Sequence, residues 1–121
     1  YSNLATATTQ AAAAIHVGDL DGTRSVTKKS WSAKVTILVH DANERPVSGA
    51  VVNGHWSTGA VASCTTGTAG TCTVSATKIP TGTTEVTFSV DRVTKSGLTY
   101  VAGTNHDPDG DSTGTSIKIA K

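Results

Sequence analysis

The densest group of side chains that could do chemistry lies at positions 105–115, where the sequence reads NHDPDGDSTGT. Asp107, Asp109 and Asp111 alternate there with proline, glycine and serine. Alternating carboxylates in a turn-forming segment direct several oxygens toward one point, and oxygen atoms are the ligands that Ca²⁺ takes. We therefore expect this segment to be a calcium-binding loop.

The spacing matches only part of an EF-hand loop. The three aspartates occupy its positions one, three and five, and Thr113 stands at position seven. Position six is Ser112 instead of glycine, and position twelve is Lys118 instead of glutamate. The segment is therefore not an EF-hand, and further ligands must come from elsewhere in the chain.

Two other clusters are candidates to complete the metal shell. Asp19 and Asp21 lie in the sequence DLDG at 19–22, and Asp41 with Asn43 lies in a predicted turn. In a standard sandwich the last long loop lies at the same end as the turn that contains Asp41. The loop predicted from Gly97 to Gly114 is long enough to reach either cluster, so both sources stay open. The alternative is that these residues only form turns, which Asp, Asn and Gly favour.

The histidines predict no catalytic site. His16, His40, His55 and His106 stand apart in the sequence, and Ser and Thr are too abundant for one nucleophile to stand out. No G-x-S-x-G, H-E-x-x-H or phosphate-binding glycine loop occurs. We expect no intrinsic enzymatic activity, and we consider His106 a candidate to orient the acidic loop by hydrogen bonding.

The only two cysteines, Cys64 and Cys72, flank a segment of Thr, Gly and Ala that is typical of a hairpin tip. A disulfide between them would join the two strands of that hairpin. A zinc site would need two more ligands, which no other cysteine or nearby histidine supplies. We expect a disulfide rather than free thiols, and hence an oxidising, extracytoplasmic location for a secreted protein.

Length and charge limit the function classes further. The 121 residues are enough for a single core, which should be thin because only 36% are hydrophobic and 4% aromatic. A net charge of +1, from ten basic and nine acidic residues, gives no reason to expect nucleic acid or an anionic membrane as partner. No apolar run approaches membrane-spanning length. We expect a monomer.

The chain divides into a linker and one domain. Residues 1–13 are of low complexity and carry no charge, as flexible linkers often do. Residues 14–121 are predicted to form a single domain. The sequence contains no methionine, from which we expect it to be a piece of a longer protein or a processed product.

Residues 31–40 alternate between apolar and polar side chains, which predicts a half-buried strand. Further strands are predicted over 14–17, 50–56, 85–93 and 115–120, and on either side of the hairpin between the cysteines. No segment shows a helical period. About seven strands separated by turns predict an all-β, immunoglobulin-like antiparallel sandwich.

The two tryptophans are either core residues or platforms for stacking against sugars. Trp56 has the same strand parity as Ala50 and Val52, which favours the core. Trp31 begins its strand, so we expect it to be partly exposed and keep it as a weak candidate for ligand binding.

Several motifs resemble a known family. VTILVHDAN at 35–43, PVSGAVV at 46–52 and the small-residue hairpin before CTV at 72–74 resemble bacterial immunoglobulin-like domains of the invasin and fibronectin type III-like kind. IHVGDLDG at 15–22 and the acidic segment 105–115 resemble accessory β-domains of secreted bacterial peptidases and polysaccharide-acting enzymes. The resemblance implies a non-catalytic module whose partner is the catalytic domain of its parent chain.

Three functions follow from these observations. The first is a calcium-stabilised accessory module that spaces or stabilises a catalytic domain. The second is a module that binds a polysaccharide or protein substrate through exposed aromatic residues or loop ends. The third is an adhesin repeat.

Overall fold

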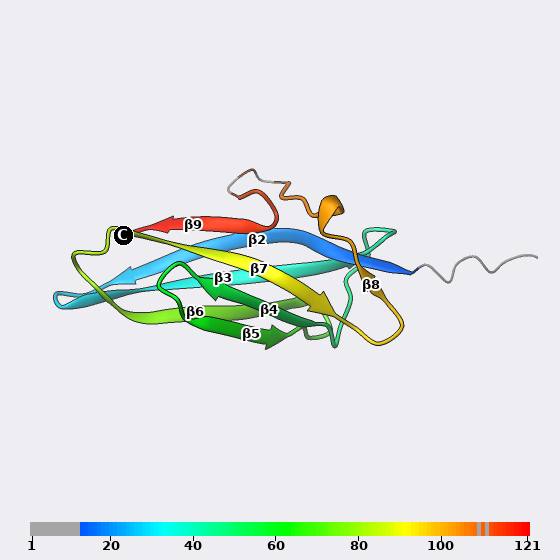
Figure 1. Ribbon diagram of the computed structural model, residues 1–121, viewed down its shortest axis with the longest axis horizontal. Helices are drawn as coiled ribbons and strands as arrows, with labels where there is room; N and C mark the ends of the chain where they lie inside the picture. The colour runs from blue at the N-terminus through cyan, green and yellow to red at the C-terminus, as the bar shows by residue number, and fades with distance from the viewer. Residues whose placement is uncertain (1–12, 109, 111) are drawn as a thin grey trace, which may run out of the picture.

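Two β-sheets pack face to face in a computed structural model that describes residues 13–108, 110 and 112–121 (Figure 1). The predicted linker lies outside the described residues except for Ala13, and so do Asp109 and Asp111. The all-β sandwich is confirmed, with two four-stranded sheets instead of about seven strands. Among the described residues no helix is long and apolar enough to cross a membrane.

The first sheet contains four strands, and three of them pair antiparallel. Its order is β6 (Thr71–Pro80), β3 (Ser30–Asp41), β2 (Ala14–Val26) and β8 (Thr99–Tyr100). β2 and β6 both pair antiparallel with β3, whereas the short β8 runs parallel to the start of β2. A short 3₁₀ helix, η2 (Ala102–Thr104), follows β8 and begins the long loop that leads to β9.

The second sheet is antiparallel throughout. Its order is β5 (Val61–Thr65), β4 (Val51–Trp56), β7 (Glu85–Thr94) and β9 (Ser116–Ala120). β2, β3 and β6 therefore share one sheet while β4, β7 and β9 share the other, as strands A, B, E and C, F, G do in immunoglobulin-like sandwiches. β5 pairs with β4 at the sheet edge.

The core lies between the sheets and is built from alternating residues. On β3 the inward side chains are at most 1% exposed: Trp31, Ala33, Val35, Ile37 and Val39. In the other sheet, the ring centroids of Phe88 and Trp56 lie 5.2 Å apart. The Trp56 side chain is 1% exposed. The core position predicted for Trp56 is confirmed.

The prediction that Trp31 is partly exposed and available to a ligand is wrong. Its side chain is buried because the alternation of β3 turns it inward with Ala33 and Val35. Its indole N–H donates to the carbonyl oxygen of Thr83 at 2.8 Å, so the polar atom is also engaged. Trp31 is therefore a structural residue of the core.

β2 is much longer than the strand predicted over 14–17, because a β-bulge lets it continue. The bulge lies at Gly18, between Val17 and Asp19 in the pairing with β3, and inserts one residue. Ile15 and Val17 point into the core before it, and Leu20 does so after it. Asp19 is thereby turned to the outer face instead of the core.

The disulfide between Cys64 and Cys72 is confirmed, with the two Cα atoms 5.8 Å apart, but the predicted hairpin is wrong. Cys64 pairs with Val52 of β4, whereas Cys72 pairs with Ile37 of β3. The two cysteine-bearing strands, β5 and β6, thus belong to different sheets. The disulfide consequently links the two sheets instead of bracing one hairpin.

Candidate metal-binding loop end

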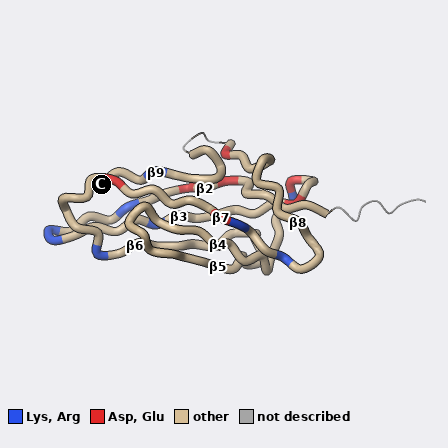
Figure 2. The backbone as a smooth tube through the Cα atoms, viewed as in Figure 1, with Lys and Arg blue, Asp and Glu red and all other residues tan. Residues whose placement is uncertain are grey.

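Three segments far apart in the sequence meet where β2 begins (Figure 1). They are the first half of β2, the turn at 41–46 after β3, and the loop at 101–115 between β8 and β9, and we call this region the loop end. Acidic residues lie on β2, on that loop and at that turn (Figure 2). Side chains that could bind a metal ion therefore come from all three segments.

Asp107 of the loop lies with Asp19 and Asp21 on the outer face of β2. Partial burial of Asp19, hydrogen bonds with the side chains of Asp107 and Asp21, and repulsion by their charges raise its pKa to about 7. Its Oδ1 atom is buried and has no hydrogen-bond partner among the described residues. Of the two clusters considered as further calcium ligands, the structure thus places Asp19 and Asp21 beside the acidic loop.

Asp41, the other source considered, stabilises its own turn. Its Oδ1 atom accepts hydrogen bonds from the backbone N–H groups of Asn43 at 2.8 Å and Arg45 at 3.0 Å. These two bonds, of which the one from Arg45 has the larger effect, lower the pKa of Asp41 despite partial desolvation. Its carboxylate is occupied by the backbone, as expected of an Asx turn.

The loop is docked onto β2 by Asn105. The side-chain oxygen of Asn105 accepts a hydrogen bond from the Val17 N–H at 2.7 Å, and its amide donates to the Tyr100 hydroxyl at 2.7 Å and the Thr115 hydroxyl at 3.0 Å. The next N–H, of His106, donates to the Val17 carbonyl at 3.1 Å. The loop thus adds to β2 as an irregular strand beside the bulge.

Hydrogen bonds within the loop orient Asp107. The Ser112 hydroxyl donates to its carboxylate, and the Gly110 N–H donates to its carbonyl at 3.2 Å. Gly114, with φ at +85°, passes so close that a Cβ there would lie 2.7 Å from the His106 nitrogen. A side chain at this position would push residue 114 away from the His106 backbone.

A histidine cluster that sequence reasoning missed lies beside these aspartates. His16, His40 and His106 surround the carboxylate of Glu44, and the four potential ligand atoms all lie within 4.8 Å of one another. One signal was present in the sequence: His16 and His40 each follow an inward apolar residue, and they prove to be direct cross-strand partners. The turn and loop partners had no such signal.

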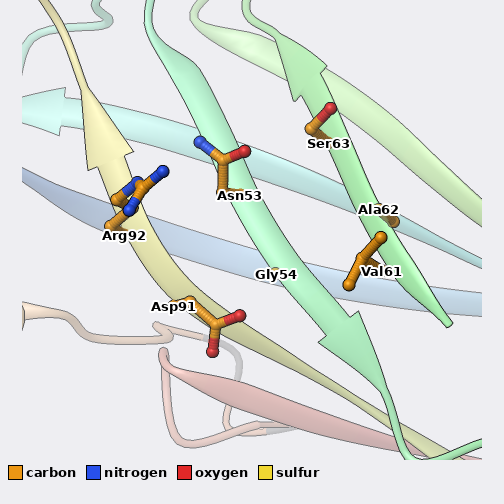
Figure 3. A pocket seen from close by; sticks show the side chains of 7 residues that line it. All are labelled: Asn53, Gly54, Val61, Ala62, Ser63, Asp91 and Arg92. Carbon is orange, nitrogen blue, oxygen red and sulfur yellow. The ribbon is translucent and has the colours of Figure 1, made fainter. Parts of the chain in front are cut away.

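His55 does not belong to this cluster. Its Nδ1 atom lies 3.0 Å from Asp91 on the outer face of the second sheet. Beside this pair is an open hollow of about 320 Å³ over β5, β4 and β7 (Figure 3). It is lined by small, aliphatic and charged side chains, with Val61 84% exposed, and no aromatic ring lines it.

The loop end can therefore supply two kinds of metal ligand. Asp19, Asp21 and Asp107 offer hard oxygen atoms, whereas His16, His40 and His106 offer imidazole nitrogens. No family model, curated protein or solved structure matches this chain.

Proposed function

We propose that this β-sandwich is a non-catalytic, calcium-stabilised accessory module of an exported multidomain enzyme. The observation that supports it is that Asp19 lies against both Asp21 and Asp107, the latter almost ninety residues further along the chain. In this proposal a bound Ca²⁺ fastens the long loop to β2 and completes the loop end.

The electrostatics of the cluster favour a cation. Without one, the ionised form of Asp19 is disfavoured by desolvation and by two neighbouring carboxylates, which is why its pKa lies near 7. A divalent ion would remove the repulsion and give the buried Oδ1 atom a partner. The ion would thus stabilise a folded loop that is strained when the site is empty.

Burial of the tryptophans favours a spacer or stabiliser over a substrate-binding module, and the disulfide bears on the location. Both tryptophans of the chain are 1% exposed, so neither offers a ring face to a sugar. The disulfide between the sheets is compatible with an oxidising, extracellular location. The catalytic domain of the parent chain is the partner that this proposal implies.

Calorimetric titration of the chelator-treated protein with Ca²⁺ tests the proposal. We expect saturable binding that is lost in Asp107→Ala and kept in the matched control Asp91→Ala, whose carboxylate lies on the other sheet. Mg²⁺ should bind more weakly because it keeps its waters and demands a tighter octahedron. Absence of Ca²⁺ binding, or unchanged binding by Asp107→Ala, would contradict the proposal.

A further inference from the structure

The three histidines and Glu44 of the loop end form a cluster distinct from the aspartates. His16 Nε2, His40 Nδ1 and His106 Nε2 lie 3.3, 3.1 and 2.9 Å from Glu44 Oε1. The His16 side chain is only 5% exposed and that of His40 15%, whereas His106 and Glu44 lie nearer the solvent. The cluster therefore has a buried floor on β2 and β3 and an accessible rim.

From this geometry we propose that His16, His40, Glu44 and His106 bind a divalent transition metal of the Zn²⁺ type. Three imidazoles with one carboxylate make a four-ligand set of the kind that holds zinc in a closed tetrahedron. Calcium is a poor match because it takes oxygen ligands. The ligands differ from those of the proposed calcium site, so the two proposals stand independently.

The spacing of the ligand atoms fits one ion after small movements. Atoms that each lie about 2.0–2.1 Å from one metal ion are at most about 4.2 Å apart, and about 3.3 Å in a regular tetrahedron. The three nitrogen–oxygen distances to Glu44 already lie near that value, and the widest ligand separation is within 4.8 Å. A pair at the 4.8 Å limit must close by about 1.5 Å to reach the tetrahedral separation, a movement that rotation of the two side chains can share.

The strands hold the two inner histidines in place before any metal arrives. His16 and His40 are directly opposite on β2 and β3, with ring centroids 5.9 Å apart. Gly18 makes room for the His40 ring, because a Cβ at this position would clash with the imidazole. The residue inserted at the β-bulge is thus a glycine that admits His40.

The two outer ligands are positioned by the turn and the loop. Glu44 adopts φ of +62°, a left-handed conformation that is unfavourable for a non-glycine residue. The turn imposes it, because the Glu44 N–H donates to the Asp41 carbonyl at 3.0 Å. This conformation accompanies a carboxylate turned back toward His40, four residues earlier. His106 is fixed by the docking of Asn105 and by its own N–H bond to Val17.

A metal would give the cluster a common structural role. His106 belongs to the long loop, Glu44 to the turn after β3, and the other two ligands to the sheet. One ion would cross-link all three segments, and it would replace contacts in which three imidazoles share one carboxylate. The hydrogen-bonded cluster without metal is the alternative that the experiment must distinguish.

The test is a titration of the metal-free 121-residue chain with Zn²⁺ in excess Ca²⁺, using a chromophoric chelator as competitor. We expect one Zn²⁺ per chain. Mutating a residue that only supports a metal ligand typically lowers metal affinity about 10–100-fold. His106→Asn removes a direct ligand, so it should weaken Zn²⁺ binding about 100-fold or more. The matched control His55→Asn should bind like the wild type.

Two further readouts keep the test independent of folding and of the calcium proposal. Imidazole ¹⁵N resonances should shift on adding Zn²⁺ for His16, His40 and His106 and stay unchanged for His55. Asp19→Asn should lose the response to Ca²⁺ yet keep Zn²⁺ binding. Absence of stoichiometric Zn²⁺ binding, or binding that His106→Asn leaves unchanged while its metal-free melting curve is native, would overturn the inference.

Discussion

Replacing Asp19 by asparagine should change how the stability of the domain depends on pH. The folded-state pKa of Asp19 is about 7, against 3.8 as its ordinary value, so the folded state holds this proton more tightly than the unfolded chain. The contribution of protonated Asp19 to the free energy of unfolding is fully present below about pH 4 and is lost as the pH rises through 7. Asparagine cannot ionise, so Asp19→Asn should lose this part of the pH dependence.

The size of the effect follows from the shift. At 1.36 kcal/mol per unit the rise from 3.8 to about 7 corresponds to at most about 4 kcal/mol, and solvent screening around this half-buried group reduces it to about 1–2 kcal/mol. In a domain of this size that amounts to about 3–10 °C in melting temperature. Without metal at pH 8, Asp19→Asn should therefore melt above the wild type by that amount.

The assay is thermal unfolding in a chelator between pH 4 and 8, followed by tryptophan fluorescence. Asp91→Asn serves as the control, because its carboxylate is exposed and pairs with His55 on the other sheet. In saturating Ca²⁺ the order should reverse, since only the wild type keeps all three carboxylates. Parallel pH profiles for the wild type and Asp19→Asn in the chelator would refute the reasoning.

The covalent and core contacts lead to two further predictions. Reducing the Cys64–Cys72 disulfide should lower the free energy of unfolding by about 2.5 kcal/mol, from the chain-entropy cost of its short loop; denaturant unfolding measures this, and two alkylated thiols in the non-reduced native protein would contradict the bond. Trp31→Phe should cost about 1 kcal/mol more than Trp56→Phe in the same assay, because Trp31 donates to Thr83 whereas the buried Trp56 Nε1 has no partner among the described residues. Equal losses would show that the hydrogen bond contributes nothing.

The strand pattern was readable from the sequence because alternation reports which face is buried. Trp31, Val35 and Val39 of β3 all lie inward as their period requires. The period failed in β2, because a bulge at Gly18 changes which residues face the core. Without that inserted residue Asp19 would share the inward parity of Val17, and this is why the predicted strand ended at Val17.

The cysteine hairpin and the histidine cluster could not be predicted correctly because both depend on contacts between residues far apart in the sequence. Cys64 and Cys72 are close in sequence, which predicted both their bond and a hairpin, but β4 and β3 draw their strands into different sheets. The histidine cluster depends on the docking of His106 and on the left-handed turn at Glu44. Neither contact leaves a periodic signal in the sequence.

The melting temperature of the wild-type domain in millimolar Ca²⁺ against excess EGTA tests the central claim most directly. A ligand that binds only the folded state adds about 2.7 kcal/mol at a hundredfold excess over its Kd, so Ca²⁺ should raise the melting temperature by several degrees. The increase should vanish in Asp107→Ala. Identical melting curves with Ca²⁺ and with EGTA would show that Asp19, Asp21 and Asp107 meet without binding calcium.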